Sequence, residues 1–252
     1  MQKLFLKKIS MIKYFNKKFY RLKTSKNYLK FMKLLHEFFG ENFIKEIEIP
    51  KLYDYSLHRS EIINKIVESH NLKDYLEIGC DQNELFLKVK IQNKIGVDPN
   101  NGGTHRMTSD TFFSKNENKF DLIFIDGLHI YSQVLKDIHN SLNCLKENGF
   151  ILLHDCFPFS YYDQAIPRAQ KKWNGDVWKA IVEMRTLNYV DTYVGAFDNG
   201  IGLILKRKNT MPLQKPRVSF KKLSYEDYYN NYKDYLNLIN AEKFFKIINE
   251  HK

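Results

Sequence analysis

Between residues 59 and 208 the sequence alternates short apolar runs with longer amphipathic segments. Runs of this length are typical of buried strands, and they cover four segments: Tyr75–Gly79, Lys94–Val97, Leu122–Ile125 and Phe150–Leu153. Strands that alternate with helices favour a mostly parallel sheet covered on both faces. This pattern predicts an α/β fold.

Two of the amphipathic segments predict long helices. Residues Ser60–Ser69 begin with Ser-Glu, which is typical of a helix N-cap, and carry isoleucines and a valine at helical spacing. Residues Tyr131–Glu147 have one apolar face and end before Asn148-Gly149, a signal that is typical of a helix C-terminus. The second helix would connect two parallel strands.

The sequence suggests three parts. Tyr193–Phe197 and Ile201–Lys206 flank Asp198-Asn199-Gly200, which predicts an antiparallel hairpin at the end of the sheet. We therefore expect a main domain at 59–208, preceded by a basic helical extension at 1–58 and followed by a helical tail at 209–252.

Positive charge is concentrated at the N-terminus. The net charge is +11, and Met1 to His36 contain eleven Lys/Arg and no acid, which leaves 29 basic and 29 acidic residues elsewhere. Apolar residues recur among these lysines at helical spacing: Leu4, Phe5, Ile9, Ile12, Phe15, Phe19 and Leu22. Such a basic amphipathic helix would lie on an anionic membrane surface, or dock on its own domain. Nucleic acid is a less favoured partner, because the main domain has no positive excess.

Cysteine content and hydropathy bear on location. The three cysteines, Cys80, Cys144 and Cys156, are too widely spaced for a zinc motif and odd in number for a disulfide framework. No apolar run approaches the roughly 20 residues that cross a bilayer. We expect a cytoplasmic protein, with peripheral membrane contact through the basic segment; the oligomeric state stays open.

Acidic residues lie at or near the ends of all four predicted strands: Glu77, Asp98, Asp126 and Asp155. One such acid is usually a cap or turn residue. However, ligands of open α/β sheets bind at the carboxyl ends of the strands. Four acids at those ends predict a binding site there.

The turn after the first strand indicates which ligand. A dinucleotide site needs Gly-x-Gly-x-x-Gly, but the run from Gly79 to Glu84 retains one glycine and carries Asp81 and Glu84, which would repel phosphate and could form a helix capping box. Asp98 follows Gly79 by nineteen residues, close to the spacing at which an acid binds ribose hydroxyls. These features favour an adenosine cofactor without phosphate.

Four stretches, "YLEIGCD", "GVDPNNGGTHRMTSDTFF", "FDLIFIDGLHIYSQVLKDI" and "GFILLHDC", resemble class I S-adenosylmethionine-dependent methyltransferases. The resemblance covers roughly Glu61 to Arg207 and is strongest to small-molecule O-methyltransferases associated with bacterial surface-glycan genes. It implies a Rossmann-like sheet with an antiparallel C-terminal hairpin strand. The implied reaction is O-methylation of a sugar, nucleotide-sugar or glycan precursor; the alternatives are an RNA methyltransferase and a non-catalytic binding or membrane-tethering module.

The resemblance also implies site residues. Those assigned to S-adenosylmethionine are Glu77, Gly79, Cys80, Asp98, Ser109, Asp110 and Asp126. His129 is the predicted general base, because an imidazole with a pKa near 6.5 can accept a hydroxyl proton. His154 and Asp155 are predicted to orient His129 or the acceptor; alternatively, His129 merely caps the helix that follows it.

A metal and an acceptor pocket are less clearly indicated. Relatives that methylate catechols bind a metal through an Asp and an Asp-Asn pair, where this chain has Asp126 and Asp155-Cys156. Magnesium prefers oxygen ligands, so Cys156 disfavours a divalent metal at Asp126 and Asp155. The acceptor pocket is expected among aromatic residues that could equally be core: Phe157, Phe159, Tyr161, Tyr162 and Trp173. The short link at 99–105 predicts a short or irregular third strand.

Overall fold

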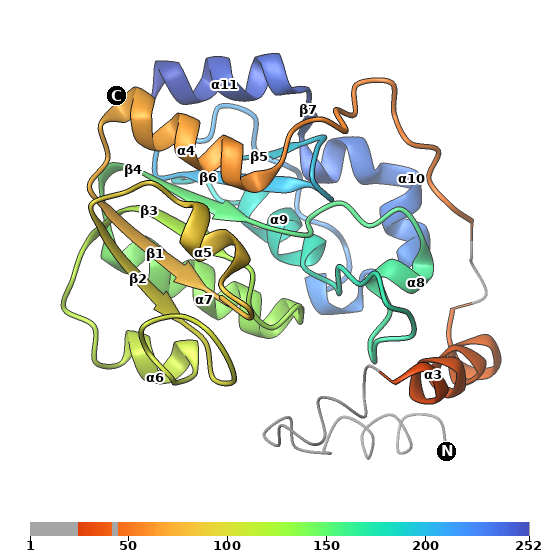
Figure 1. Cartoon of the computed structure of the whole chain (residues 1–252). Coiled ribbons are helices and arrows are strands. Elements are labelled where there is room, and N and C mark those ends of the chain that lie inside the picture. Colours follow the sequence, from red (N-terminus) through yellow and green to blue (C-terminus); the bar gives the residue numbers. More distant parts are fainter. Residues whose placement is uncertain (1–24, 42–44, 252) are drawn as a thin grey trace.

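A computed structural model describes residues 25–41 and 45–251, so the predicted amphipathic helix of Leu4 to Leu22 lies outside the described part. The centre is one seven-stranded sheet in the order β2-β1-β3-β4-β6-β5-β7 (Figure 1). Its strands are β1 (Asp74–Ile78), β2 (Asn93–Val97), β3 (Phe120–Ile125), β4 (Leu145–Leu153), β5 (Asp191–Gly195), β6 (Ile201–Leu205) and β7 (Leu238–Ile239). The predicted α/β class is confirmed.

Strands β1 to β4 are parallel, whereas β6 runs antiparallel to both β4 and β5. The chain proceeds from β1 outward to β2 and then returns to place β3 on the other side of β1. In open α/β sheets, ligands bind beyond the carboxyl ends of the strands at such a reversal, which here are β1 and β3.

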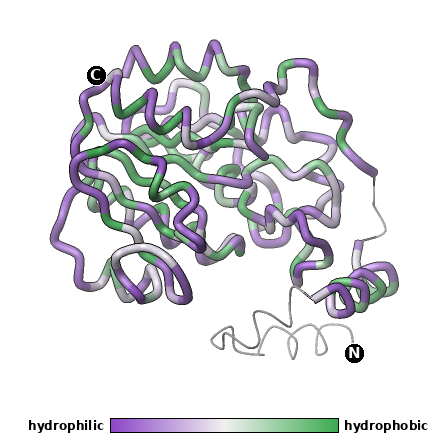
Figure 2. The backbone as a smooth tube through the Cα atoms, viewed as in Figure 1, coloured by the Kyte–Doolittle hydropathy of each residue, from purple (hydrophilic) through white to green (hydrophobic). Residues whose placement is uncertain are grey.

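Helices cover both faces of the sheet. They are α3 (Lys26–Phe39), α4 (Arg59–His70), α5 (Glu84–Lys88), α6 (Ser109–Phe113), α7 (Tyr131–Cys144), α8 (Tyr161–Gln164), α9 (Trp178–Arg185), α10 (Tyr225–Leu236) and α11 (Ala241–Glu250), with a 3-10 turn η1 (Phe220–Lys222). Alternate strand residues face two cores: one includes α7, α9 and α10, and the other α4, α5 and α11. Figure 2 shows the apolar residues concentrated along the central strands.

Two helix boundaries differ from the prediction. Helix α4 begins at Arg59, and His58 rather than Ser60 is its N-cap, in a capping box with Glu61. Helix α7 ends at Cys144 instead of Glu147, because Leu145 already pairs with Phe120 as the first residue of β4. Asn148-Gly149 lies within β4, where the chain makes an irregularity with Asn148 at φ +57°. The Asn148-Gly149 pair therefore marks an irregularity within β4 and not the end of a helix.

Other expectations hold at the edges of the sheet. The hairpin of β5 and β6 forms around Asp198 and Asn199, both at positive φ. After the short link at 99–105, the chain forms only a single bridge, between His105 and Val97, before it reaches β3. The C-terminal segment contains α10 and α11, and it also adds β7 beside β5.

Candidate active site

The carboxyl ends of β1, β3 and β4 are tied together by backbone hydrogen bonds. The amide of Asp126 donates to the carbonyl of Ile78 at 2.8 Å, and the amide of His154 donates to the carbonyl of Ile125 at 3.0 Å. Asp126, His154 and Asp155 therefore leave the sheet at one place, and one ligand atom from each lies within 4.8 Å of the others. The predicted convergence of Asp126 and Asp155 is confirmed by this geometry.

His129 lies between these two carboxylates. Its Nε2 is 3.3 Å from Asp126 Oδ1, and its Nδ1 is 3.2 Å from both Asp155 Oδ2 and the carbonyl oxygen of Trp173. Burial alone would lower the pKa of His129, but the hydrogen bond to Asp126 and the charge of Asp155 raise it above 6.5. The side chain is 18% exposed, so one edge of the ring can reach a ligand.

His129 does not cap α7. The N-cap residue is Ile130, without a side-chain hydrogen bond, and the first amide of the helix, at Tyr131, donates to Asp176 Oδ1 at 2.6 Å. Asp176, from the segment that precedes α9, therefore caps α7. The alternative in which His129 is only a cap is therefore wrong.

His154 is fixed on both sides. Its Nδ1 faces Asp126 at 3.3 Å and Asp155 at 3.5 Å, and its Nε2 is 3.1 Å from Asp198 Oδ1. Burial opposes the charged form, yet Asp155 and Asp126 raise the pKa of His154 well above 6.5. Carboxylates therefore lie near both nitrogens of His154, and Arg59 Nη1 also lies 3.2 Å from Nε2. These contacts hold the buried ring in one orientation beside Asp126 and Asp155.

Two members of this network were not predicted as site residues. Asp198, in the β5–β6 turn, accepts from the Arg59 amide at 2.6 Å and from Arg59 Nη1 at 3.1 Å. In the sequence, Asp198 has the form of a turn residue and Arg59 precedes an ordinary helix. Only the fold, which brings the hairpin beside α4, identifies them.

The segment Trp173-Asn174-Gly175 encloses His129 on another side. The Trp173 ring stacks on the imidazole with 5.4 Å between centroids and 8° between planes. Asn174, fully buried, donates to Asp155 Oδ1 at 3.3 Å. At Gly175, with φ +63°, a Cβ would meet the His129 carbonyl oxygen at 1.8 Å, so only glycine fits. This close packing restricts His129 and Asp155 to one arrangement.

The turn after β1 does not offer a phosphate site. Helix α5 has five residues, and its N-cap is Asn83 at φ +65° without a side-chain hydrogen bond, so the predicted Asp81–Glu84 capping box is wrong. Asn83 Oδ1 instead accepts from the Gly103 amide at 2.6 Å. This bond packs the 98–105 loop against the N-terminal end of α5. Gly79 at φ +92° lies so close to Asp126 that a Cβ would be 2.2 Å from its carbonyl oxygen.

The other predicted cofactor residues on β1 and β2 lie beside this turn. Asp98 is nearly buried at the end of β2, and its carboxylate accepts from the amides of Asn100, Asn101 and Asp81. Glu77 is 1% exposed; burial raises its pKa to about 7, and it accepts from the Tyr75 hydroxyl.

Cys80 is also buried, and its thiol donates to the Glu77 carbonyl, so only its backbone could touch a ligand. Burial raises the pKa of Glu77, which disfavours its negative charge. The imidazole rings of His129 and His154 lie against Asp126 and Asp155 and offset part of the negative charge of those two carboxylates.

Ser109 and Asp110 form a second group at the start of α6. Gln133 of α7, one turn after His129, donates to both, at 3.2 Å and 2.9 Å. The same amide donates to the buried Asp137, whose pKa burial raises to about 6. Helix α7 therefore links Ser109 and Asp110, two of the predicted cofactor residues, to the segment that carries His129.

Most of the aromatic residues expected in the acceptor pocket are core. Phe157 is fully buried and stacks on Tyr232, and the Tyr161 hydroxyl pairs with His36 of α3. Trp173 is the member of that set that touches His129.

The donor atoms of Asp126, His154 and Asp155 are not the all-oxygen set that a magnesium ion prefers. Cys156, which stands where an amide oxygen would be needed, is fully buried, and its thiol donates to the carbonyls of Leu153 and His154. Burial raises the pKa of this thiol. In the cluster of Asp126, His154 and Asp155, the third donor is an imidazole nitrogen, whereas Mg²⁺ prefers oxygen.

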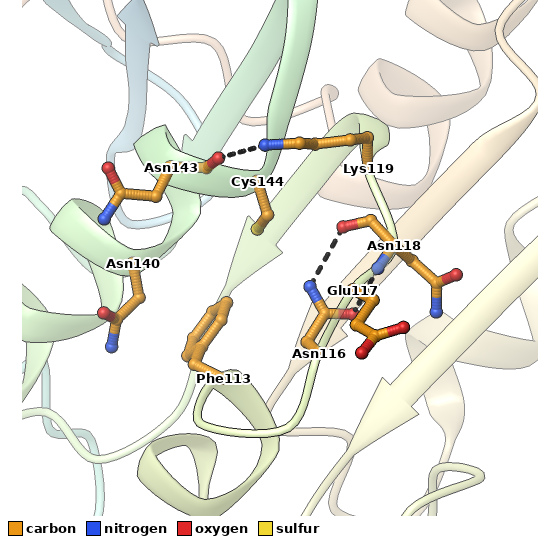
Figure 3. Close-up of a pocket in the computed structure, with 8 residues that line it drawn as sticks. All are labelled: Phe113, Asn116, Glu117, Asn118, Lys119, Asn140, Asn143 and Cys144. Carbon is orange, nitrogen blue, oxygen red and sulfur yellow. Dashed lines mark hydrogen bonds between the residues drawn. The ribbon is translucent and has the colours of Figure 1, made fainter.

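A separate pocket of about 160 Å³ lies at the opposite edge of the sheet (Figure 3). It is lined by residues that precede β3, such as Asn118 and Lys119, and by the end of α7, including Asn143 and Cys144. Since these residues lie at the amino ends of β3 and β4, this pocket is separate from Asp126, His154 and Asp155 at the carboxyl ends.

Residues 65–156 match a protein family described as "Methyltransferase domain". Among solved structures, the chain is similar to the SAH-bound methyltransferase PaMTH1 of Podospora anserina, with 16% identity, a TM-score of 0.46, and 60% of this chain and 78% of that chain covered.

It is also similar to an O-methyltransferase of Bacillus cereus in complex with SAH, with 13% identity, a TM-score of 0.42, and 62% of this chain and 82% of that chain covered. No curated protein sequence matches the chain. The residues that match this family description run from α4 to the turn after β4 and include Gly79, Asp98, Asp126, His129 and Asp155.

Proposed function

We propose that the protein transfers a methyl group from S-adenosylmethionine to a hydroxyl of a sugar, nucleotide-sugar or glycan precursor, with His129 as the general base. The observation that carries this proposal is the position of His129 between Asp126 and Asp155, at the crevice beside Gly79. The acceptor class follows the family resemblance of the sequence.

The residues at the carboxyl ends of β1, β2 and β3 suit a nucleoside without phosphate. The N-terminus of α5 is covered by the Gly103 loop, which argues against a dinucleotide, while Asp98 offers a carboxylate at the end of β2. When bound, S-adenosylmethionine would supply an activated methyl group on a sulfonium. Gly79, Asp98 and Asp126 would hold it from the β1–β3 side, and Ser109 and Asp110 from the α6 side.

His129 would handle the acceptor proton. Its Nδ1 is directed at the Trp173 carbonyl and Asp155, so this nitrogen keeps its proton, and Nε2 is the nitrogen that exchanges one. When an acceptor hydroxyl is methylated, its proton would pass to Nε2 of His129. Asp126, 3.3 Å from Nε2, stabilises the imidazolium that results.

The test uses labelled S-adenosylmethionine with an extract of nucleotide sugars and glycans. We expect label transfer by the unaltered protein and a loss of at least about a hundredfold in His129→Ala, the lower range for a general base. Cofactor affinity measured by calorimetry should change little. His139→Ala, which changes an exposed histidine on α7, the helix that follows His129, is the matched control. Equal turnover in His129→Ala would remove His129 from catalysis.

A further inference from the structure

Helix α3 has an apolar face that no described residue covers. Phe31, Leu34 and Phe38 are 55%, 45% and 79% exposed. Their spacing of three and four residues places them on one side of the helix. The other side is docked: Met32 and His36 are buried against the domain.

The docked side of α3 contacts the segment that follows Asp155, one of the candidate site residues. His36 Nε2 donates to the carbonyl of Pro167 at 2.7 Å, and the Tyr161 hydroxyl donates to His36 Nδ1 at 2.9 Å. The same segment, residues 157–176, continues to Trp173, which stacks on His129. Helix α3 is therefore packed on the loop that borders the candidate active site (Figure 1).

Charge identifies what could cover the apolar face. Lys26 and Lys30 are exposed on α3 beside it, and residues 1–24 of the sequence add eight Lys/Arg (Lys3, Lys7, Lys8, Lys13, Lys17, Lys18, Arg21 and Lys23) and no acid. A second copy of this chain would bring the same positive charge and be repelled. Three side chains are also far fewer than the roughly 20 residues a side of a stable protein interface.

We infer that the exposed face of α3, formed by Phe31, Leu34 and Phe38 with Lys26 and Lys30, docks on an anionic membrane surface. The aromatic and leucine side chains would enter the interfacial layer while the lysines contact anionic headgroups. Docking would hold residues 157–176 near the lipid, so that an acceptor carried at the membrane could reach His129; this consequence rests on the proposed function.

Vesicle co-sedimentation of the full chain tests the docking surface. We expect binding to phosphatidylcholine vesicles that contain about 30% phosphatidylglycerol to be at least tenfold stronger than to phosphatidylcholine alone. The triple change Phe31→Ser, Leu34→Ser, Phe38→Ser should weaken it at least about tenfold. A matched control replaces three exposed apolar residues elsewhere, Leu87→Ser, Met211→Ser and Val218→Ser, and should bind like the unaltered chain.

Three outcomes would overturn the inference: no preference for anionic vesicles, equal loss in the control, or undiminished binding by the α3 variant, which would assign all binding to the basic first 24 residues. A dimer that the α3 variant converts to a monomer, without vesicle binding, would identify a second copy as the occupant. Titration of the same preparations with S-adenosylmethionine tests the proposed function separately, because vesicle binding does not require the cofactor.

Discussion

Replacement of Asp198 by Asn tests the network that fixes His154. The carboxylate accepts from the Arg59 amide and guanidinium and from His154 Nε2. An asparagine retains one acceptor oxygen, and its NH₂ group must face either Arg59 or His154, so at least one donor loses its partner. Charged hydrogen bonds contribute about 1.5–3 kcal/mol each. Because the Arg59 side chain is 32% exposed and can turn to water, we expect a net loss of about 2–3 kcal/mol in the free energy of unfolding.

The loss should depend on pH with a defined sign. The pKa of His154 is raised above 6.5, so its stabilising contribution is full below pH 6.5 and is lost as pH rises through the folded value. Burial opposes ionisation of Asp198, but its bond to His154 lowers its pKa below 3.8, so its contribution is full above pH 3.8 and is lost at lower pH. The effect of Asp198→Asn should therefore be largest between those values.

The assay is urea denaturation at pH 5.5 and at higher pH, with Glu250→Gln, from an exposed pair with Lys246, as control. A loss of about 2–3 kcal/mol corresponds to about 4–12 °C in melting temperature. If Asp198→Asn were as stable as the control, or if its effect grew steadily with rising pH, the imidazolium network would be refuted.

Three further predictions concern the reaction. Trp173→Ala should lower kcat about 10- to 100-fold with unchanged S-adenosylmethionine affinity, and Trp173→Phe, which keeps a stacking ring on His129, should recover most of it; equal kcat in both variants would contradict a positioning role. Because the pKa of His129 is raised above 6.5 and its neutral form accepts the proton, kcat should rise with pH above 6.5, and a profile that falls there would contradict the assignment. Since Cys156 offers no oxygen ligand, turnover measured after EDTA treatment should equal that of the untreated enzyme, and recovery only on adding Mg²⁺ would contradict the donor analysis.

The sheet and the strand-end residues could be predicted because they depend on local signals. Apolar runs with the correct spacing identified β1 to β4, and the carboxyl ends of parallel strands necessarily meet at one edge. Asp126 and Asp155 were therefore found from position alone. Helix ends were less predictable: Asn148-Gly149 favours a helix terminus by itself, but pairing of Leu145 with β3 starts the strand earlier.

The partners of the site residues depend on contacts between distant segments. Asp198 and Arg59 are 139 positions apart, and Trp173 is 44 from His129. Neither pair has a local pattern that would reveal it. Likewise, the side chain of Asn83, the N-cap residue of α5, accepts from the amide of Gly103 in the neighbouring loop and makes no capping bond to its own helix. Tertiary contacts override local preference in each case.

The central claim is that the crevice between β1 and β3 binds S-adenosylmethionine and excludes phosphate-bearing dinucleotides. Calorimetric titration of the unaltered chain, and of Asp98→Ala, with S-adenosylmethionine and with NAD measures this directly. The account predicts saturable one-to-one binding of S-adenosylmethionine that weakens at least about tenfold in Asp98→Ala, with no binding of NAD. Absence of S-adenosylmethionine binding, or equally tight binding of NAD, would contradict it.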